Sequence, residues 1–252
     1  MALREALSEH EPEICTVAWL LAERGWAEAN GGNLSLRLGG SFDPAGERFP
    51  LSIPRPELEG HSLLLTTAGS RMREVADNPL NNICLVQIVD GGEAYIAENT
   101  PGEVTSELPS HLAVHAVLCK ERPDHRALLH THPTFLIALT HLAPDNSEIL
   151  DTLVRMFPEA ALLLHDNLEV LDYRTPGSDE LGVATAEAIR RVSGVVWPGH
   201  GMLASGANLY SALDLVEVAD KAARIALLLG DRSKECGLST DQIQRIYEAF
   251  GD

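Results

Sequence analysis

The sequence has 252 residues, 45% of them hydrophobic, which is enough for a sizeable core, and we expect one domain spanning residues 1–252. The 37 acidic residues outnumber the 19 basic ones, and the formal net charge of −18 argues against nucleic acid or an anionic membrane surface as a partner. The cysteines show no C-x-x-C spacing, the first residues show no targeting pattern, and no apolar run approaches the roughly 20 residues of a membrane span, so we expect a reduced, cytoplasmic protein.

Hydrophobic periodicity in the first half of the chain predicts one helix followed by several strands. Apolar residues repeat at helical spacing over residues 14–21, and Gly25 supplies a stop signal. Residues 34–38 alternate between apolar and polar, as in a half-buried strand, and a long loop rich in Pro and Gly is expected over residues 39–60. Further strands are expected at residues 63–65, 83–89 and 94–96, with a hairpin turn at residues 90–92.

The second half of the chain predicts helices between further strands. A helix capped by Thr105 or Ser106 should run to about Lys120, and a strand, a helix and a strand should follow through Leu164. The later elements are a helix from Ser178 to Val192, strands at residues 195–197 and 202–204, a helix over residues 209–229 closed by Gly230, and a last helix with a Ser239–Gln242 capping box. This mixture of hairpins and helices indicates an α/β protein with a mixed sheet covered on both faces.

The most informative motif is His130-Thr131-His132, which closes an apolar, strand-like run. Residues two apart on a strand share one face, so the two imidazoles can reach one metal ion. A third candidate ligand, His200, ends another short apolar run. Three neutral nitrogens would leave a zinc ion open to substrate. The alternative is that these are ordinary buried or surface histidines.

Two short segments carry turn residues that can bind an anion. Asn30, Gly31 and Asn33 belong to an Asn-Gly-Gly-Asn turn ahead of a predicted strand, where backbone N–H groups and amide side chains can donate to an anion. The Thr-Thr-Ala-Gly-Ser segment that contains Gly69 is similar in kind. The first segment could equally be a plain turn, and the second, which is the weaker signal, could be only the exit of a strand.

The segment Thr105-Ser106-Glu107 combines two hydroxyls and a carboxylate at a predicted helix start. The hydroxyls and free N–H groups could contact an anion, and the carboxylate could act as a general base beside a metal. The alternative is a helix cap with a Glu that complements the helix dipole. On the same helix, His111 and His115 mimic a helical metal motif with Glu107, but their apolar neighbours favour a structural role.

Taken together, these motifs resemble the class II aldolases, a family that includes sugar-phosphate aldolases and ribulose-5-phosphate epimerases. They cover most of the chain in the expected order. The matching segments are Gly-Trp (25–26), Asn-Gly-Gly-Asn-Leu (30–34), Thr-Ser-Glu-Leu-Pro (105–109), His-Thr-His (130–132), Ile-Ala-Leu-Thr (137–140), Pro-Gly-Ser-Asp-Glu-Leu-Gly (176–182), Trp-Pro-Gly-His-Gly (197–201) and Ser-Gly (205–206).

The resemblance implies a three-layer α/β/α fold with a mixed, largely antiparallel central sheet and one zinc ion per subunit. It implies Glu107 as the catalytic acid/base. The family usually shows Thr-Gly-Ser-Gly in a second phosphate loop, from which this chain departs at residues 66–70. The implied zinc ligands are His130, His132 and His200, and the implied phosphate-binding residues are Asn30, Gly31, Asn33, Gly69, Thr105 and Ser106.

The resemblance also implies an activity, metal-dependent aldol cleavage of a ketose 1-phosphate, in a homotetramer. It is strongest to family members that split L-rhamnulose 1-phosphate into dihydroxyacetone phosphate and L-lactaldehyde. Another sugar-phosphate aldolase, an epimerase or a dehydratase of the family would use a similar site, although Thr-Ser-Glu-Leu-Pro favours the first reaction. A non-catalytic interaction domain would not need an open metal position, so the histidine triad and Glu107 count against it.

Overall fold

A mixed β-sheet forms the centre of the computed structural model, which describes residues 2–40, 42–98, 104–143 and 145–250. Within these residues nine strands lie in the order β2-β5-β4-β3-β1-β6-β9-β8-β7, and each neighbouring pair is antiparallel except β7 and β8. The strands are β1 (Asn33–Arg37), β2 (Glu47–Pro50), β3 (Ser62–Thr66), β4 (Ile83–Val89), β5 (Ala94–Glu98), β6 (Ala127–Thr131), β7 (Leu168–Val170), β8 (Gly194–Trp197) and β9 (Gly201–Gly206).

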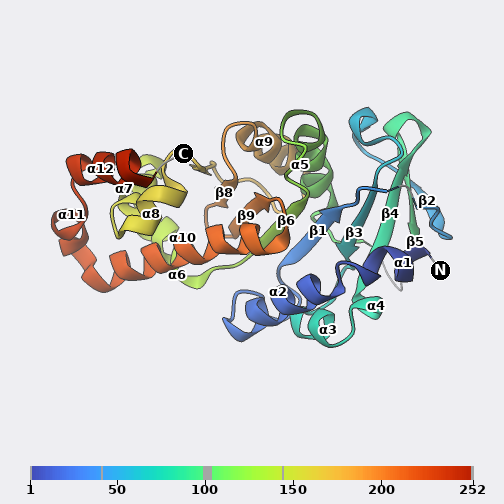
Figure 1. Ribbon diagram of the computed structural model, residues 1–252, viewed down its shortest axis with the longest axis horizontal. Coiled ribbons are helices and arrows are strands. Elements are labelled where there is room, and N and C mark those ends of the chain that lie inside the picture. The colour runs from blue at the N-terminus through green and yellow to red at the C-terminus, as the bar shows by residue number, and fades with distance from the viewer. Residues whose placement is uncertain (1, 41, 99–103, 144, 251–252) are drawn as a thin grey trace.

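Helices cover both faces of this sheet, which confirms the predicted three-layer fold with a largely antiparallel sheet. In Figure 1, α5 and α9 lie above the sheet, and α2 and α10 lie below it. Among the described residues, no helix has the length and apolarity needed to cross a membrane. The helices are α1 (Ala2–Ser8), α2 (Glu11–Glu23), α3 (Met72–Asp77), α4 (Pro79–Asn82), α5 (Leu108–Glu121), α6 (Thr134–Leu142), α7 (Asn146–Val154), α8 (Pro158–Leu164), α9 (Asp179–Ile189), α10 (Leu209–Leu229), α11 (Ser233–Cys236) and α12 (Thr240–Phe250), with short 3-10 turns η1 (Pro56–Leu58), η2 (Asp90–Gly92) and η3 (Gly230–Arg232).

Several predicted helix ends are confirmed by their capping contacts. The side chain of Ser178 accepts a hydrogen bond at the start of α9, and Gly230 ends α10 with a positive φ of 57°. Before α12, the backbone N–H of Ser239 donates to the side chain of Gln242, and the N–H of Gln242 donates back to Ser239 Oγ. These contacts satisfy backbone groups that a helix end leaves without partners.

The strand β1 differs from the prediction of a half-buried strand, because all five of its residues are buried. Leu34 and Leu36 pack into the core below the sheet, as the alternation predicts. Ser35, however, faces α5, where its hydroxyl contacts the imidazoles of His111 at 2.7 Å and His115 at 2.8 Å. The polar positions of β1 therefore face a buried polar layer and not solvent.

Two other elements depart from the prediction. The expected loop over residues 39–60 contains β2, an edge strand whose mostly exposed residues lack an apolar alternation. The strand expected to end at Leu164 is the helix α8, which begins at Pro158 and buries Ala160, Ala161 and Leu164. Those three positions recur at helical spacing. The composition of a short apolar run, however, does not show whether the run forms a helix or a strand.

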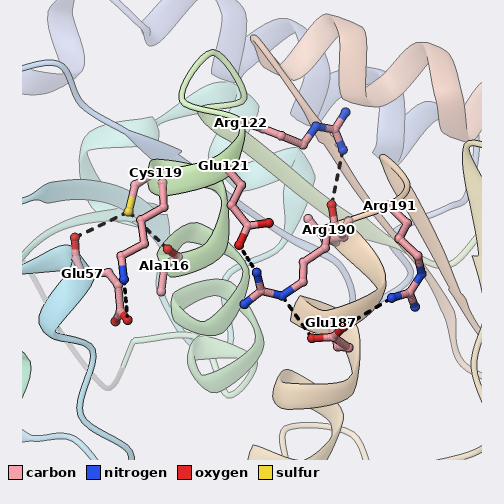
Figure 2. Close-up of polar contacts among 10 residues, drawn as sticks. Glu57, Ala116, Cys119, Glu121, Arg122, Glu187, Arg190 and Arg191 are labelled. Carbon is pink, nitrogen blue, oxygen red and sulfur yellow. Dashed lines mark hydrogen bonds and ion pairs between the residues drawn. The ribbon is translucent and has the colours of Figure 1, made fainter.

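The helices α5 and α9 are joined by a set of arginine contacts at their C-terminal ends (Figure 2). Arg190 pairs with Glu121 across the two helices. The guanidinium of Arg122 donates to the carbonyl oxygens of Ile189 at 3.3 Å and Val192 at 2.8 Å. Arg122 thus supplies donors to carbonyls that the end of α9 leaves unpaired, and it holds α9 against α5.

We expect Arg122→Met to destabilise the protein by about 2 kcal/mol, since hydrogen bonds from a charged donor are lost at a partly buried helix end. For a chain of this length, that loss corresponds to a melting temperature about 4–8 °C lower. Arg191→Met is the matched control, because Arg191 forms exposed ion pairs with Glu169 and Glu187 that contribute little. Equal melting temperatures of the two variants, measured by calorimetry, would contradict this role for Arg122.

Candidate active site

Three histidines that are distant in the sequence converge at one edge of the sheet. His130 lies in β6, His132 follows its end, and His200 lies in the turn between β8 and β9. The ring centroids are 5.0 Å apart for His130 and His132, 4.7 Å for His130 and His200, and 5.2 Å for His132 and His200. Within the described residues, this is the one group of His, Cys, Asp and Glu side chains arranged to share a metal ion.

Hydrogen bonds to two of these rings determine which nitrogen atoms can bind a metal. The backbone carbonyl of Met202 accepts from Nδ1 of His130 at 3.1 Å, and a carboxylate oxygen of Glu28 accepts from Nδ1 of His132 at 2.9 Å. Both Nδ1 atoms therefore carry the proton, and the two Nε2 atoms, 3.2 Å apart, present lone pairs to each other. Two facing lone pairs repel unless a cation lies between them, so these residues fit a zinc ion.

The surroundings of the triad favour neutral imidazoles. Burial, together with the nearby His200 and His132, holds the pKa of His130 well below its ordinary value. Burial also lowers the pKa of His200 to about 4, with His132 contributing. The ring of Trp197 stacks on His200 with 5.2 Å between centroids. Nδ1 of His200 is buried and has no hydrogen-bond partner among the described residues, so this ring has a nitrogen available to a ligand.

The Asn-Gly-Gly-Asn turn lies directly against the triad. A Cβ atom on Gly31 would lie 2.9 Å from the ring of His132, so a side chain there would displace that ring. Asn33 is buried and pairs with His130 in the antiparallel register of β1 and β6, whereas Asn30 is exposed at the start of the turn. The structure therefore brings the first predicted anion-binding segment and the predicted metal ligands together.

The second and third predicted segments also meet at this edge. The backbone N–H of Thr105 donates to the carbonyl of Thr66 at 3.3 Å, and the hydroxyl of Thr66 accepts from the N–H of Leu34 at 3.3 Å. Gly69 adopts a left-handed φ of 76°, with open space where a Cβ would be. Ser106 is exposed beside the buried Thr105. The three segments thus lie side by side around the ends of β1 and β3.

Glu107 occupies the N-cap position of α5, so the predicted cap at Thr105 or Ser106 is wrong by one or two residues. Its own side chain makes no capping hydrogen bond, and Thr105 Oγ1 instead accepts from the N–H of Glu107 at 3.3 Å. The carboxyl accepts a hydrogen bond from the N–H of Gly177, yet burial raises its pKa. Its Oε2 atom is buried and unpartnered within the described residues. Such a carboxyl is suited to exchanging a proton with a ligand.

Three contributors to the site were not predicted from the sequence. Glu28 and the carbonyl of Met202 orient the rings of His132 and His130, and the N–H of Gly177 contacts Glu107. Two of these contributions come from the backbone, which any residue type can supply. Glu28 shows no signal other than its place two residues before the Asn-Gly-Gly-Asn turn.

Known proteins resemble this chain over most of its length. The family described as Class II Aldolase and Adducin N-terminal domain matches residues 12–227. The chain is 35% identical to the rhamnulose-1-phosphate aldolase of Listeria welshimeri over 227 residues, covering 84% of this chain and 81% of that protein. It is 31% identical to the rhamnulose-1-phosphate aldolase of Bacteroides thetaiotaomicron over 258 residues, covering 98% and 96% respectively.

A solved structure gives the same result for the fold. The sugar-phosphate aldolase of Thermotoga maritima superposes with a TM-score of 0.79 at 34% sequence identity, covering 88% of this chain and 95% of that one. The match of the family over most of the chain and the identity to two relatives over most of their length establish the relationship. The chain therefore belongs to the class II aldolase family.

Proposed function

We propose that this protein cleaves L-rhamnulose 1-phosphate into dihydroxyacetone phosphate and L-lactaldehyde. The observation that carries the proposal is the convergence of three imidazoles, with facing Nε2 lone pairs, beside the turn that contains Asn33. The relatives at 31–35% identity are named for rhamnulose-1-phosphate cleavage, which favours this substrate over the ketose phosphates of other family members.

His130, His132 and His200 are the residues that would hold a zinc ion, one per subunit. Zinc supplies Lewis-acid stabilisation of the negative charge that develops on the substrate oxygens when the carbon–carbon bond breaks. The chain contributes the orientation of the donors, because Met202 and Glu28 keep the Nδ1 protons of His130 and His132 turned away from the site.

The phosphate would be held by neutral donors. Backbone N–H groups in glycine-containing turns and the amide and hydroxyl side chains beside them can approach an anion closely. The net charge of −18 does not prevent this, since exposed charges are screened beyond about 8 Å at physiological salt. The proposed phosphate-binding residues are Asn30, Gly31, Asn33, Gly69, Thr105 and Ser106.

Glu107 would move the proton in the reaction. Its buried, unpartnered Oε2 atom is free to accept a proton from the hydroxyl at the bond that breaks or to return one to the carbon fragment. The pKa raised by burial brings the carboxyl closer to the working pH, where a proton-transfer group is most effective. The N–H of Gly177 fixes the other part of the carboxyl in place.

We infer further that residues 1–252 form one domain that works in the cytoplasm as a homotetramer. Leu142, Tyr173 and Leu228 are large apolar side chains that are mostly exposed in the single chain, and burying them against other subunits would be favourable. The four cysteines are free thiols, as expected for a reducing compartment.

Replacing His130 by alanine removes one of three metal donors, so we expect His130→Ala to lose its zinc and its cleavage of L-rhamnulose 1-phosphate. Metal analysis of the purified protein measures the first effect, and release of dihydroxyacetone phosphate measures the second. His10→Ala is the control, since His10 lies outside the triad before α2. Undiminished zinc in His130→Ala, with activity that survives chelation, would refute the assignment.

For Glu107→Gln we expect the fold, the zinc content and the binding of a dihydroxyacetone phosphate mimic to be retained, because the amide preserves size and polarity. Turnover should fall by about 100-fold or more, the scale for loss of a general acid/base. Were Glu107 only a charge at the helix start, the change would cost less than about 1 kcal/mol and leave turnover intact. Loss of zinc together with activity would identify it as a ligand instead.

The proposed assembly gives a separate expectation. Light scattering of the purified protein at micromolar concentration should report the mass of four chains. A monomer with full cleavage activity would contradict the tetramer while leaving the proposed reaction intact.

A further inference from the structure

A row of four buried polar side chains runs between β1 and α5. Figure 1 shows these two elements next to each other in the middle of the molecule. Nε2 of His111 contacts Oδ1 of Asn33 at 2.5 Å, and Nδ1 of His111 contacts Oγ of Ser35 at 2.7 Å. Nε2 of His115 contacts the same hydroxyl at 2.8 Å. The row thus ends at Asn33, beside the metal ligands.

Each imidazole in the row is neutral and carries a single N–H group. Burial lowers the pKa of His111 to about 3. Burial, with smaller contributions from His111, Arg37 and His61, also holds the pKa of His115 well below its ordinary value. A neutral imidazole has one N–H donor and one acceptor nitrogen, so each contact along the row determines the next one.

Two directions of donation give the hydroxyl hydrogen of Ser35 an acceptor in the row, and they differ at the far end. If His115 donates from Nε2 to Ser35, then Ser35 donates to Nδ1 of His111, and His111 donates from Nε2 to Asn33. Nδ1 of His115, which has no partner among the described residues, is then a bare lone pair. The opposite direction would leave a buried N–H there without an acceptor, which is rare in folded proteins.

The first direction fixes the amide of Asn33. Its Oδ1 atom accepts from His111, so the amide group cannot rotate by half a turn without losing that bond. The NH₂ group, with two donors, then remains for a ligand at the edge where Asn33 pairs with His130. A rotated amide would instead present its oxygen, the negative end of the amide dipole, to the negatively charged phosphate.

We propose that His111 is a positioning residue that locks the NH₂ group of Asn33 toward the substrate phosphate, through a row of hydrogen bonds that begins at His115. This inference rests on the proposed function, because it takes Asn33 as a phosphate ligand. His111 acts through Asn33 and does not touch the reacting atoms.

Two amide variants of different reach separate this role from a structural one. The side-chain nitrogen of Gln extends about as far as Nε2 of an imidazole, so His111→Gln keeps a donor to Asn33, whereas His111→Asn reaches only Ser35. We expect His111→Asn to raise KM for L-rhamnulose 1-phosphate about tenfold or more with kcat within about threefold, and His111→Gln to stay close to the parent protein. Equal KM values for the two variants would overturn the proposal.

Val114→Ala controls for loss of stability in the same helix. Val114 is buried in the apolar cluster that α5 shares with α9, and it does not belong to the row. Its truncation should therefore lower the melting temperature and leave KM unchanged. If KM followed melting temperature across the three variants, the role of His111 would be structural only.

Two measurements test the inference without turnover, so that its failure is distinct from failure of the proposed reaction. Binding of inorganic phosphate to the zinc-loaded protein, followed by calorimetry, should weaken for His111→Asn and not for His111→Gln. Nitrogen–proton correlation spectra of labelled histidine in the parent protein should place the proton of His111 on Nε2. A proton on Nδ1, or equal phosphate binding by the two variants, would overturn the proposal even if the protein cleaves L-rhamnulose 1-phosphate.

Discussion

The register between β1 and β6 is the constraint on which the site depends. Asn33 stands opposite His130, and both strands are buried on both faces. Because side chains alternate along a strand, a slip of one residue would turn His130 toward α2 and α10 and bring Leu129 into its place. Leu34 and Leu129, packed on the far face, oppose such a slip because it would move apolar side chains into the polar layer.

The parts of this structure that the sequence predicts are those with local signals. The ends of α10 and α12 and the pair His130 and His132 each depend on residues a few positions apart. The contacts of Glu28 with His132 and of Gly177 with Glu107 join distant segments and leave no mark in composition or spacing. These remaining contacts of the site could therefore be identified only from the folded structure.

The polar layer under α5 shows why a correct pattern led to a wrong environment. A strand that faces water and a strand that faces buried partners both alternate apolar and polar residues, as β1 does. Burying Ser35 and Asn33 without partners would be costly, but His111 and His115 satisfy them through a connected set of hydrogen bonds. Only the position of α5 over β1 distinguishes the two environments.

This layer also bears on how an acidic chain can act on an anion. A neutral ligand set such as His130 and His200 leaves the full charge of a metal ion available to the substrate. Amide and hydroxyl donors carry no positive charge, so they do not form ion pairs with the carboxylates of this acidic chain in place of the substrate phosphate. Recognition by neutral donors depends on their direction more than on long-range attraction, which screening suppresses. A buried row that fixes the direction of the Asn33 amide therefore has a chemical consequence that an apolar core of equal stability would lack.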